Sequence, residues 1–128
     1  MTLLLRRALA ILRGMDGCIF CRIAAHQVNA RILFEDEHVV AFHDAAPRAP
    51  VHVLVIPRQH IVSLAQVAPG EQDLLGRLLL AAAEAARQTG VAGSGYRVVT
   101  NCGASAGQSV LHLHIHVLGG RSLAWPPG

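Results

Sequence analysis

Short blocks of apolar residues alternate with polar, glycine-containing or proline-containing stretches in the first half of the chain. Residues 18–28 carry apolar positions at a short helical period, which predicts one or two helical turns. Residues 31–35 and 39–44 have the pattern of two strands joined by a turn. Residues 51–57 are almost entirely apolar, as is typical of a buried central strand, and Pro57 ends the run.

The second half contains the one strongly predicted helix, over residues 70–90, and two further strands. Gly90 ends the helical pattern, and residues 61–67 allow one additional helical turn. Residues 95–101 and 110–118 have the composition of strands. The apolar stripe predicted for the long helix consists of Leu74, Leu75, Leu78, Leu79, Ala82 and Ala86.

This order of elements predicts an α+β fold, with a five-stranded, mostly antiparallel sheet, one long helix and a short N-terminal helix. A chain of 128 residues suffices for one domain, which we place at residues 15–128. The apolar runs within residues 1–14 are too short to cross a bilayer, so no membrane association is expected. Three interpretations of residues 1–14 stay open: a short amphipathic helix, an organelle-type presequence, or an unstructured extension upstream of a second start at Met15.

The net charge of +3 comes from residues 1–14 rather than from the domain. Three of the eleven arginines lie there, which leaves eight arginines against eight acidic residues. A domain without excess positive charge is not expected to bind nucleic acid. The chain has no lysine, which excludes a lysyl-nucleotide intermediate and a Walker-type phosphate loop. Its odd number of cysteines indicates a reducing compartment, and we expect a cytoplasmic protein.

Three histidines, His112, His114 and His116, alternate with apolar residues in the last predicted strand. On a strand they would share one face, with neighbouring side chains about 7 Å apart. Zinc needs its ligand atoms about 2 Å from the metal, so one ion would not bind all three. A solvated edge-strand face is the alternative, but such a row better suits a neutral nucleophile whose neighbours handle protons. The small-residue loop 101–109 offers backbone amides to an anion such as phosphate.

The segment QSVLHLHIHVLGGR resembles the signature of the histidine triad (HIT) family. The blocks CIFCRI, LFEDEHVVAFHD, APVHVLVIPRQH, GYRVVTNCG and WPPG are similar to family blocks in the same order, so the resemblance covers residues 17–128. The chain most resembles the branch of Hint-type nucleoside phosphoramidases. This resemblance implies hydrolysis of purine nucleoside phosphoramidates and related conjugates of AMP or GMP, through a covalent nucleotidyl-histidine.

The resemblance also implies roles for individual residues. His114 would attack the α-phosphorus, and His116 would bind the phosphate and help move a proton to the leaving group. His52 would belong to the same proton network, and Ser109 would lie near the phosphate. The nucleotide-binding residues implied by the resemblance are Ile19, Phe20, Ile23, Phe42, Asp44, Ala45, Asn101, Gly107, Gln108, Ser109 and His116.

Within this set, Asp44 would accept the ribose hydroxyls, and Gly107 and Gln108 would bring backbone amides to the phosphate. Ala45 stands where relatives often have a larger aliphatic residue, and it would loosen the base pocket. Ordinary core packing is the alternative for the apolar residues, above all for Ile23.

Cys18 and Cys21 have the spacing of zinc ligands, but one such pair is only half a site. In some relatives the site is completed by the histidines that correspond to His60 and His112. The resemblance therefore implies a structural zinc ion bound by all four residues, while hydrolysis needs no metal. Two reduced, buried thiols are the alternative.

The resemblance further implies a homodimer in which Trp125 in the C-terminal segment reaches the partner's active site. Packing of this side chain on its own chain is the alternative.

Two other functions stay open: dinucleoside polyphosphate hydrolysis or nucleotidyl transfer, and non-catalytic nucleotide binding by a zinc-stabilised protein. The intact histidine row with Ser109 and Asn101 favours catalysis, because a binding protein needs no nucleophile.

Overall fold

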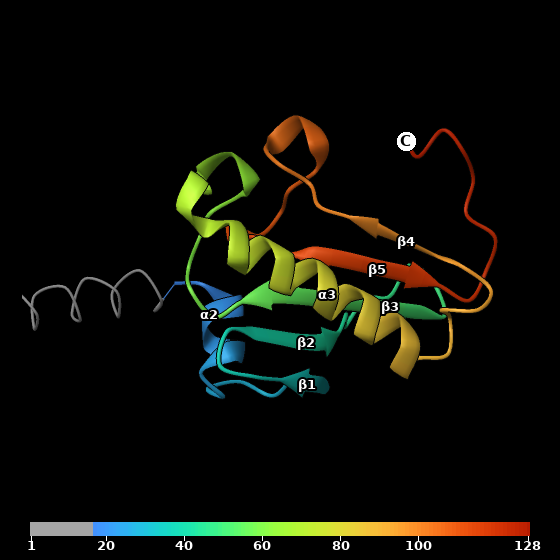
Figure 1. The fold of residues 1–128 in the computed structure, drawn as a ribbon, viewed down its shortest axis with the longest axis horizontal. Helices are drawn as coiled ribbons and strands as arrows, with labels where there is room; N and C mark the ends of the chain where they lie inside the picture. The colour runs from blue at the N-terminus through green and yellow to red at the C-terminus, as the bar shows by residue number, and fades with distance from the viewer. Residues whose placement is uncertain (1–16) are drawn as a thin grey trace, which may run out of the picture.

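The computed structural model describes residues 17–128, and the extension predicted for residues 1–14 lies outside them. Five strands form one antiparallel sheet in the order β1-β2-β3-β5-β4. The long helix α3 packs on one face of this sheet and the short helix α2 on the other (Figure 1). The elements are α2 Ile19–Ala24, β1 Ile32–Glu35, β2 Val39–His43, β3 Val51–Pro57, α3 Gln72–Gln88, β4 Tyr96–Val99 and β5 Ile115–Gly119.

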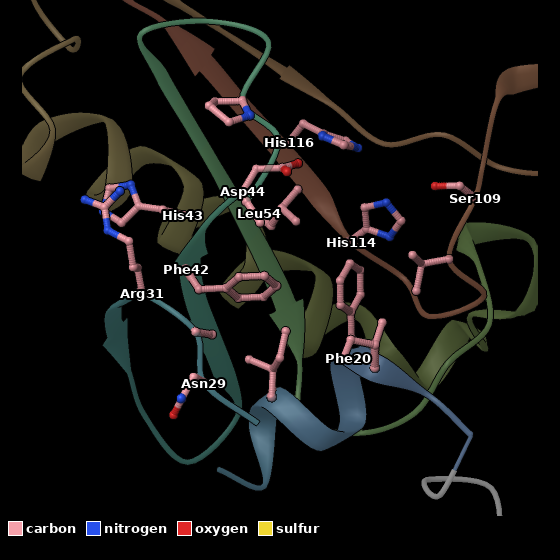
Figure 2. A pocket seen from close by; sticks show the side chains of 16 residues that line it. Phe20, Asn29, Arg31, Phe42, His43, Asp44, Leu54, Ser109, His114 and His116 are labelled. Carbon is pink, nitrogen blue, oxygen red and sulfur yellow. The ribbon is translucent and has the colours of Figure 1, made fainter. Parts of the chain in front are cut away.

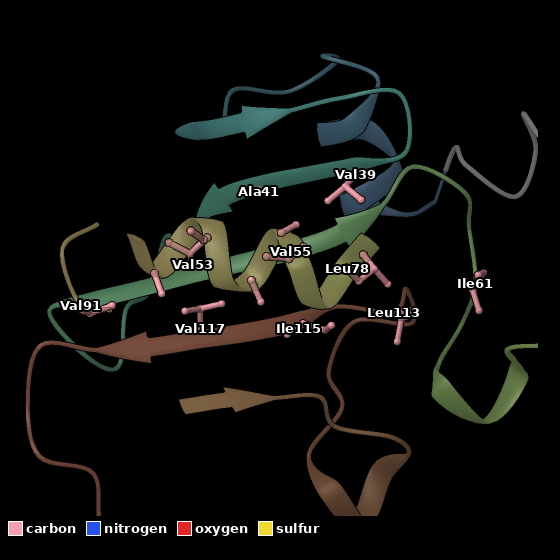
Figure 3. Packing of buried hydrophobic residues seen from close by; sticks show 14 residues of the cluster. Val39, Ala41, Val53, Val55, Ile61, Leu78, Val91, Leu113, Ile115 and Val117 are labelled. Atoms are coloured by element: carbon pink, nitrogen blue, oxygen red, sulfur yellow. The ribbon is translucent and has the colours of Figure 1, made fainter. Parts of the chain in front are cut away.

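Alternation along the central strands divides the buried side chains between two apolar clusters. On β2, Val39 and Ala41 belong to the cluster under α3, whereas Val40 and Phe42 belong to the cluster under α2. Strand β3 repeats this alternation. Figure 3 shows the first cluster between α3 and the sheet. Because both faces of the central strands are covered, residues 51–57 can be almost entirely apolar.

Helix α3 presents mostly small side chains to the sheet. Leu78 is fully buried, and the other buried residues of the helix are Ala81, Ala82, Ala85 and Ala86. Alanine lets a helix lie close to the strands beneath it, and Leu78, together with the half-buried Leu74 and Leu75, fills the space that remains.

The predicted α+β fold is confirmed, including the long helix, the short helix and the five-stranded sheet. The predicted helical stripe was too wide, because Leu79 is 58% exposed. The alanines on the inner face make the contact with the sheet, so Leu79 lies on the outer side. Among residues 17–128, no helix has the length and apolar character needed to cross a bilayer.

The last strand is shorter than predicted. It begins at Ile115 rather than at residue 110, so His112 and His114 precede it. Leu111 lies in the irregular segment before β5 and is 63% exposed. Of the three histidines expected to share one face of a strand, only His116 therefore lies in the strand.

We expect Leu78→Ala to lower the free energy of unfolding by about 2–5 kcal/mol, because it leaves a cavity between α3 and the sheet. Leu80→Ala is the matched control, since the Leu80 side chain is 73% exposed on the same helix, and its effect should stay within about 0.5 kcal/mol. Urea denaturation of both variants measures the two values. Equal effects would contradict the packing described above.

Candidate active site and metal centre

A cavity of about 680 Å³ opens between α2, the C-terminal part of β2 and the segment before β5. In Figure 2, Ser109 and His114 lie on one side of it, and Asn29 and Arg31 lie on the opposite side. Its volume is in the range of small-molecule sites. The predicted catalytic and nucleotide-binding residues that line the cavity are Ile19, Phe20, Ile23, Phe42, Asp44, Ala45, Ser109, His114 and His116.

Three predicted nucleotide-binding residues, Asn101, Gly107 and Gln108, do not line this cavity. The amides of Gly107 and Gln108 donate to carbonyls of their own loop, at 3.0 and 3.1 Å. The Gln108 side chain donates to the Val62 carbonyl at 2.7 Å. Gln108 therefore holds the loop in place, and the structure does not present these two amides as the free phosphate donors that the resemblance implies.

His114 has one defined tautomer. Its Nδ1 lies 2.7 Å from the carbonyl oxygen of His112, and a carbonyl only accepts, so Nδ1 carries the hydrogen. The lone pair of neutral His114 is then on Nε2. The Thr100 hydroxyl donates to the His114 carbonyl at 2.8 Å and fixes the backbone at this residue. The ring of Phe20 stands nearly perpendicular to the His114 ring, with the ring centres 5.0 Å apart.

The hydrogens of His52 and His116 can be placed in the same way. The Arg48 amide donates to Nδ1 of His52 at 3.0 Å, so the hydrogen of neutral His52 is on Nε2. Nε2 of His52 lies 2.8 Å from Nδ1 of His116 and donates to it. The hydrogen of neutral His116 is therefore on Nε2. The Asp44 carboxylate lies 3.4 Å from Nε2 of His52 and lines the cavity beside this pair.

Burial keeps the His52–His116 pair uncharged. Burial, followed by the neighbouring His114 and His52, lowers the pKa of His116 to about 4. Burial also lowers the pKa of His52, against the opposing effect of Asp44. Both imidazoles are therefore neutral near pH 7, which agrees with the hydrogen positions derived from their partners.

The four predicted metal ligands converge on one point. Nδ1 of His112 lies 3.4 Å from the sulfur of Cys18, 3.4 Å from that of Cys21 and 3.2 Å from Nδ1 of His60. The sulfur of Cys21 lies 3.2 Å from Nδ1 of His60. Burial, followed by Cys18, raises the pKa of the Cys21 thiol to about 12, and burial lowers the pKa of His112 to about 4.

This geometry fits a tetrahedral zinc ion. Bond lengths of about 2.3 Å to sulfur and about 2.0 Å to nitrogen separate sulfur from nitrogen by about 3.5 Å, and two nitrogens by about 3.3 Å. Nε2 of His112 donates to the Pro57 carbonyl at 2.8 Å, which leaves Nδ1 free as a ligand atom. The Cys18, Cys21, His60 and His112 side chains are therefore compatible with a zinc site.

A second group, Asp44, His52 and His116, is equally compact, with one ligand atom of each residue within 4.8 Å of the others. It suits protons rather than a metal. A metal on Nε2 of His52 would displace the hydrogen there while the Arg48 amide still occupied Nδ1, which requires an imidazolate. The tautomers therefore distinguish two clusters of similar composition: the group around His112 suits a metal ion, and the group of Asp44, His52 and His116 does not.

Sequence reasoning missed several contributors to the site. Leu54 lines the cavity, and its position two residues after His52 on one strand was a usable signal, because both side chains point to the same face. The Thr100 hydroxyl and the Arg48 amide act through contacts between distant segments. No spacing in the sequence indicates such contacts.

The fold and the site define a small α+β protein with paired histidine clusters beside a ligand cavity. Residues 25–123 match the family model for the HIT domain. The protein therefore belongs to the HIT family.

Individual relatives agree with this assignment. An uncharacterized HIT-like protein from Synechococcus elongatus is 53% identical over 113 residues, covering 88% of this chain and 98% of that protein. A HIT family hydrolase from Legionella pneumophila superimposes with a TM-score of 0.85 at 42% identity, covering 88% of this chain and 100% of the other. A HIT family hydrolase from Clostridium thermocellum has a TM-score of 0.83 at 42% identity, covering 85% and 95%.

The depressed pKa of His116 makes stability depend on pH. The folded chain leaves His116 neutral down to about pH 4, whereas the unfolded chain binds this proton near 6.5. The unfolded state therefore holds more protons in this window, and the free energy of unfolding should fall as the pH is lowered through it. The contribution cannot exceed about 1.4 kcal/mol per pH unit. Urea denaturation at several pH values should give a shallower dependence for His116→Asn, and equal slopes would contradict this.

Proposed function

We propose that the protein hydrolyses phosphoramidates and related conjugates of AMP or GMP, with a covalent nucleotidyl intermediate on His114. The observation that carries this proposal is the tautomer of His114 at the cavity wall. Its Nδ1–H is held by the His112 carbonyl, so the lone pair of the neutral imidazole lies on Nε2, where it can act as a nucleophile. His116 is adjacent, with the two ring centres 5.0 Å apart.

The cavity lining supports a nucleotide as the ligand. Phe20 and Phe42 pack edge to face, with ring centres 5.5 Å apart, and form an apolar wall suited to a purine base. Asp44 supplies a carboxylate between this wall and the histidines, where it can accept the two ribose hydroxyls (Figure 2). One of its oxygens is fixed by the Ala46 amide at 2.8 Å, which sets the orientation of the carboxylate.

The proposed reaction has two displacements. In the first, Nε2 of His114 forms a bond to the α-phosphorus as the bond from phosphorus to the leaving nitrogen breaks. The Nε2–H of His116 donates a hydrogen bond to that nitrogen, which takes its proton from solvent and leaves as an amine. In the second, water attacks phosphorus, the bond to His114 breaks, and the proton lost by water passes to solvent. The overall change adds one water molecule and releases an amine and a nucleoside monophosphate.

We also propose that Cys18, Cys21, His60 and His112 bind a structural zinc ion. Four protein ligands leave no open position, so such a metal supplies stability rather than chemistry to the reaction. It would attach α2, which carries one side of the cavity, to the segment that holds His114. The homodimer, the place of the exposed Trp125 beside the partner's site and the cytoplasmic location stay predictions.

Replacement of His114 tests the proposed function. His114→Ala should lower kcat for release of AMP from an adenosine phosphoramidate by at least about a hundredfold, because the nucleophile is lost. His38→Ala is the control, since this exposed histidine lies outside the cavity. A discontinuous assay of AMP formation measures all three proteins. Equal, slow release by the wild type and His114→Ala would contradict the proposal.

Metal analysis tests the proposed zinc site. Protein purified without chelator should contain about one zinc ion per chain, and Cys21→Ser should lose it together with part of the thermal stability. Cys102→Ser is the matched control, because this exposed cysteine lies outside the cluster. Less than about a tenth of an equivalent in the wild type would exclude the four-ligand site.

A further inference from the structure

The turn that follows β5 lies against the loop that precedes β3. The two strands are antiparallel neighbours, and Val51 at the start of β3 pairs with Gly119 at the end of β5 (Figure 1). Gly120 has a φ of +88°, and a Cβ atom there would meet the Pro50 side chain at 2.9 Å. Only glycine allows this approach, so the turn is closely fitted to Pro50 at the end of the loop.

Arg121 extends the contact into the loop. Its Nε and one terminal nitrogen both donate to the Arg48 carbonyl, at 3.2 and 2.9 Å, and the other terminal nitrogen donates to the Ser122 carbonyl at 3.0 Å. Within the described part of the chain, Arg121 has no acidic partner within ion-pair distance. Its guanidinium is instead used to hold main-chain oxygens, chiefly that of Arg48.

Arg48 connects this contact to the candidate active site. Its carbonyl is held by Arg121, and its amide donates to Nδ1 of His52. The amide in turn determines that the His52 hydrogen lies on Nε2, which faces His116. A continuous series of hydrogen bonds thus runs from Arg121 to the imidazole beside the cavity.

We propose that Arg121 is a positioning residue for the proposed reaction: by holding the Arg48 carbonyl it keeps the Arg48 amide on His52 and so determines which nitrogen of His116 carries the hydrogen. This inference rests on the proposed function for its effect on catalysis. Its structural part, the tautomer of His52, is independent of any substrate.

The chemistry of the alternative state shows why the position matters. Without the Arg48 amide, the hydrogen of His52 can move to Nδ1, and Nε2 then accepts from Nδ1 of His116. His116 would thereby lose the hydrogen on Nε2, the one that donates a hydrogen bond to the leaving nitrogen in the proposed reaction. The other groups that face the pair are the Asp44 carboxylate and His114, and neither contacts Nδ1 of His52.

A second arginine provides a matched control. Arg97 donates to the Ala124 carbonyl at 2.7 Å and so also anchors the C-terminal segment. It makes no hydrogen bond to residues 44–50 among the described residues. Loss of Arg97 removes an anchor of the tail, whereas loss of Arg121 removes the contact with Arg48 as well.

The test combines spectroscopy with kinetics on the full chain. Nitrogen-15 labelled histidine and long-range nitrogen–proton correlation report the tautomer of His52 in the wild type, Arg121→Met, Arg121→Lys and Arg97→Met. We expect the wild type and Arg97→Met to hold the hydrogen on Nε2. Arg121→Met should populate the Nδ1 form and lower kcat for an adenosine phosphoramidate about tenfold with KM within about twofold. Arg121→Lys keeps an ammonium group as a donor, so it should restore part of the Nε2 tautomer of His52 and part of kcat.

Two results would overturn the proposal: an unchanged His52 tautomer in Arg121→Met, or an equal change in Arg97→Met, which would assign the effect to the tail. If Arg121→Met does not fold, Arg121→Gln, whose amide is too short to reach the Arg48 carbonyl, replaces it with the same expectations. A wild type that releases no AMP would refute the proposed function, and the tautomer measurement would still decide the role of Arg121.

Discussion

The hydrogen bond from Nε2 of His112 to the Pro57 carbonyl fixes the residue on which both the candidate metal centre and the candidate nucleophile depend. It anchors a buried imidazole to the end of β3 and turns Nδ1 toward the two thiols and His60. The carbonyl of the same residue holds Nδ1–H of His114. One residue therefore serves the candidate metal centre with its ring and the candidate nucleophile with its backbone, so the two sites cannot shift independently.

Hydrogen position, rather than residue type, distinguishes the chemistry of the two clusters. Each cluster contains two histidines and at least one potentially anionic side chain within a few ångströms. A carbonyl behind His112 leaves a lone pair facing the cluster, whereas an amide behind His52 leaves a hydrogen facing it. The former suits a metal ligand and the latter a proton donor. The main chain at the end of β3 and in the loop before it thus assigns opposite roles to two side chains of the same type.

The sequence alone predicts the fold class, because central strands covered on both faces and an amphipathic helix leave clear periodic patterns. It also predicts most cavity residues and the three side chains, Cys18, Cys21 and His60, that surround His112. It fails where geometry departs from regular strands: residues 110–118 were expected to form one strand, but the chain before Ile115 is irregular. Contacts made by main-chain groups, such as the amide of Arg48 and the loop amide of Gln108, leave no pattern in residue types.

Phe20 belongs to both regions at once. Its ring stands edge-on to Phe42 and His114 on the cavity side and 6.0 Å from the His112 ring on the other. A smaller side chain at this position would remove one wall of the cavity and the edge contact with the His112 ring together. A change in cavity size made at residue 20 therefore also changes the surroundings of a candidate metal ligand.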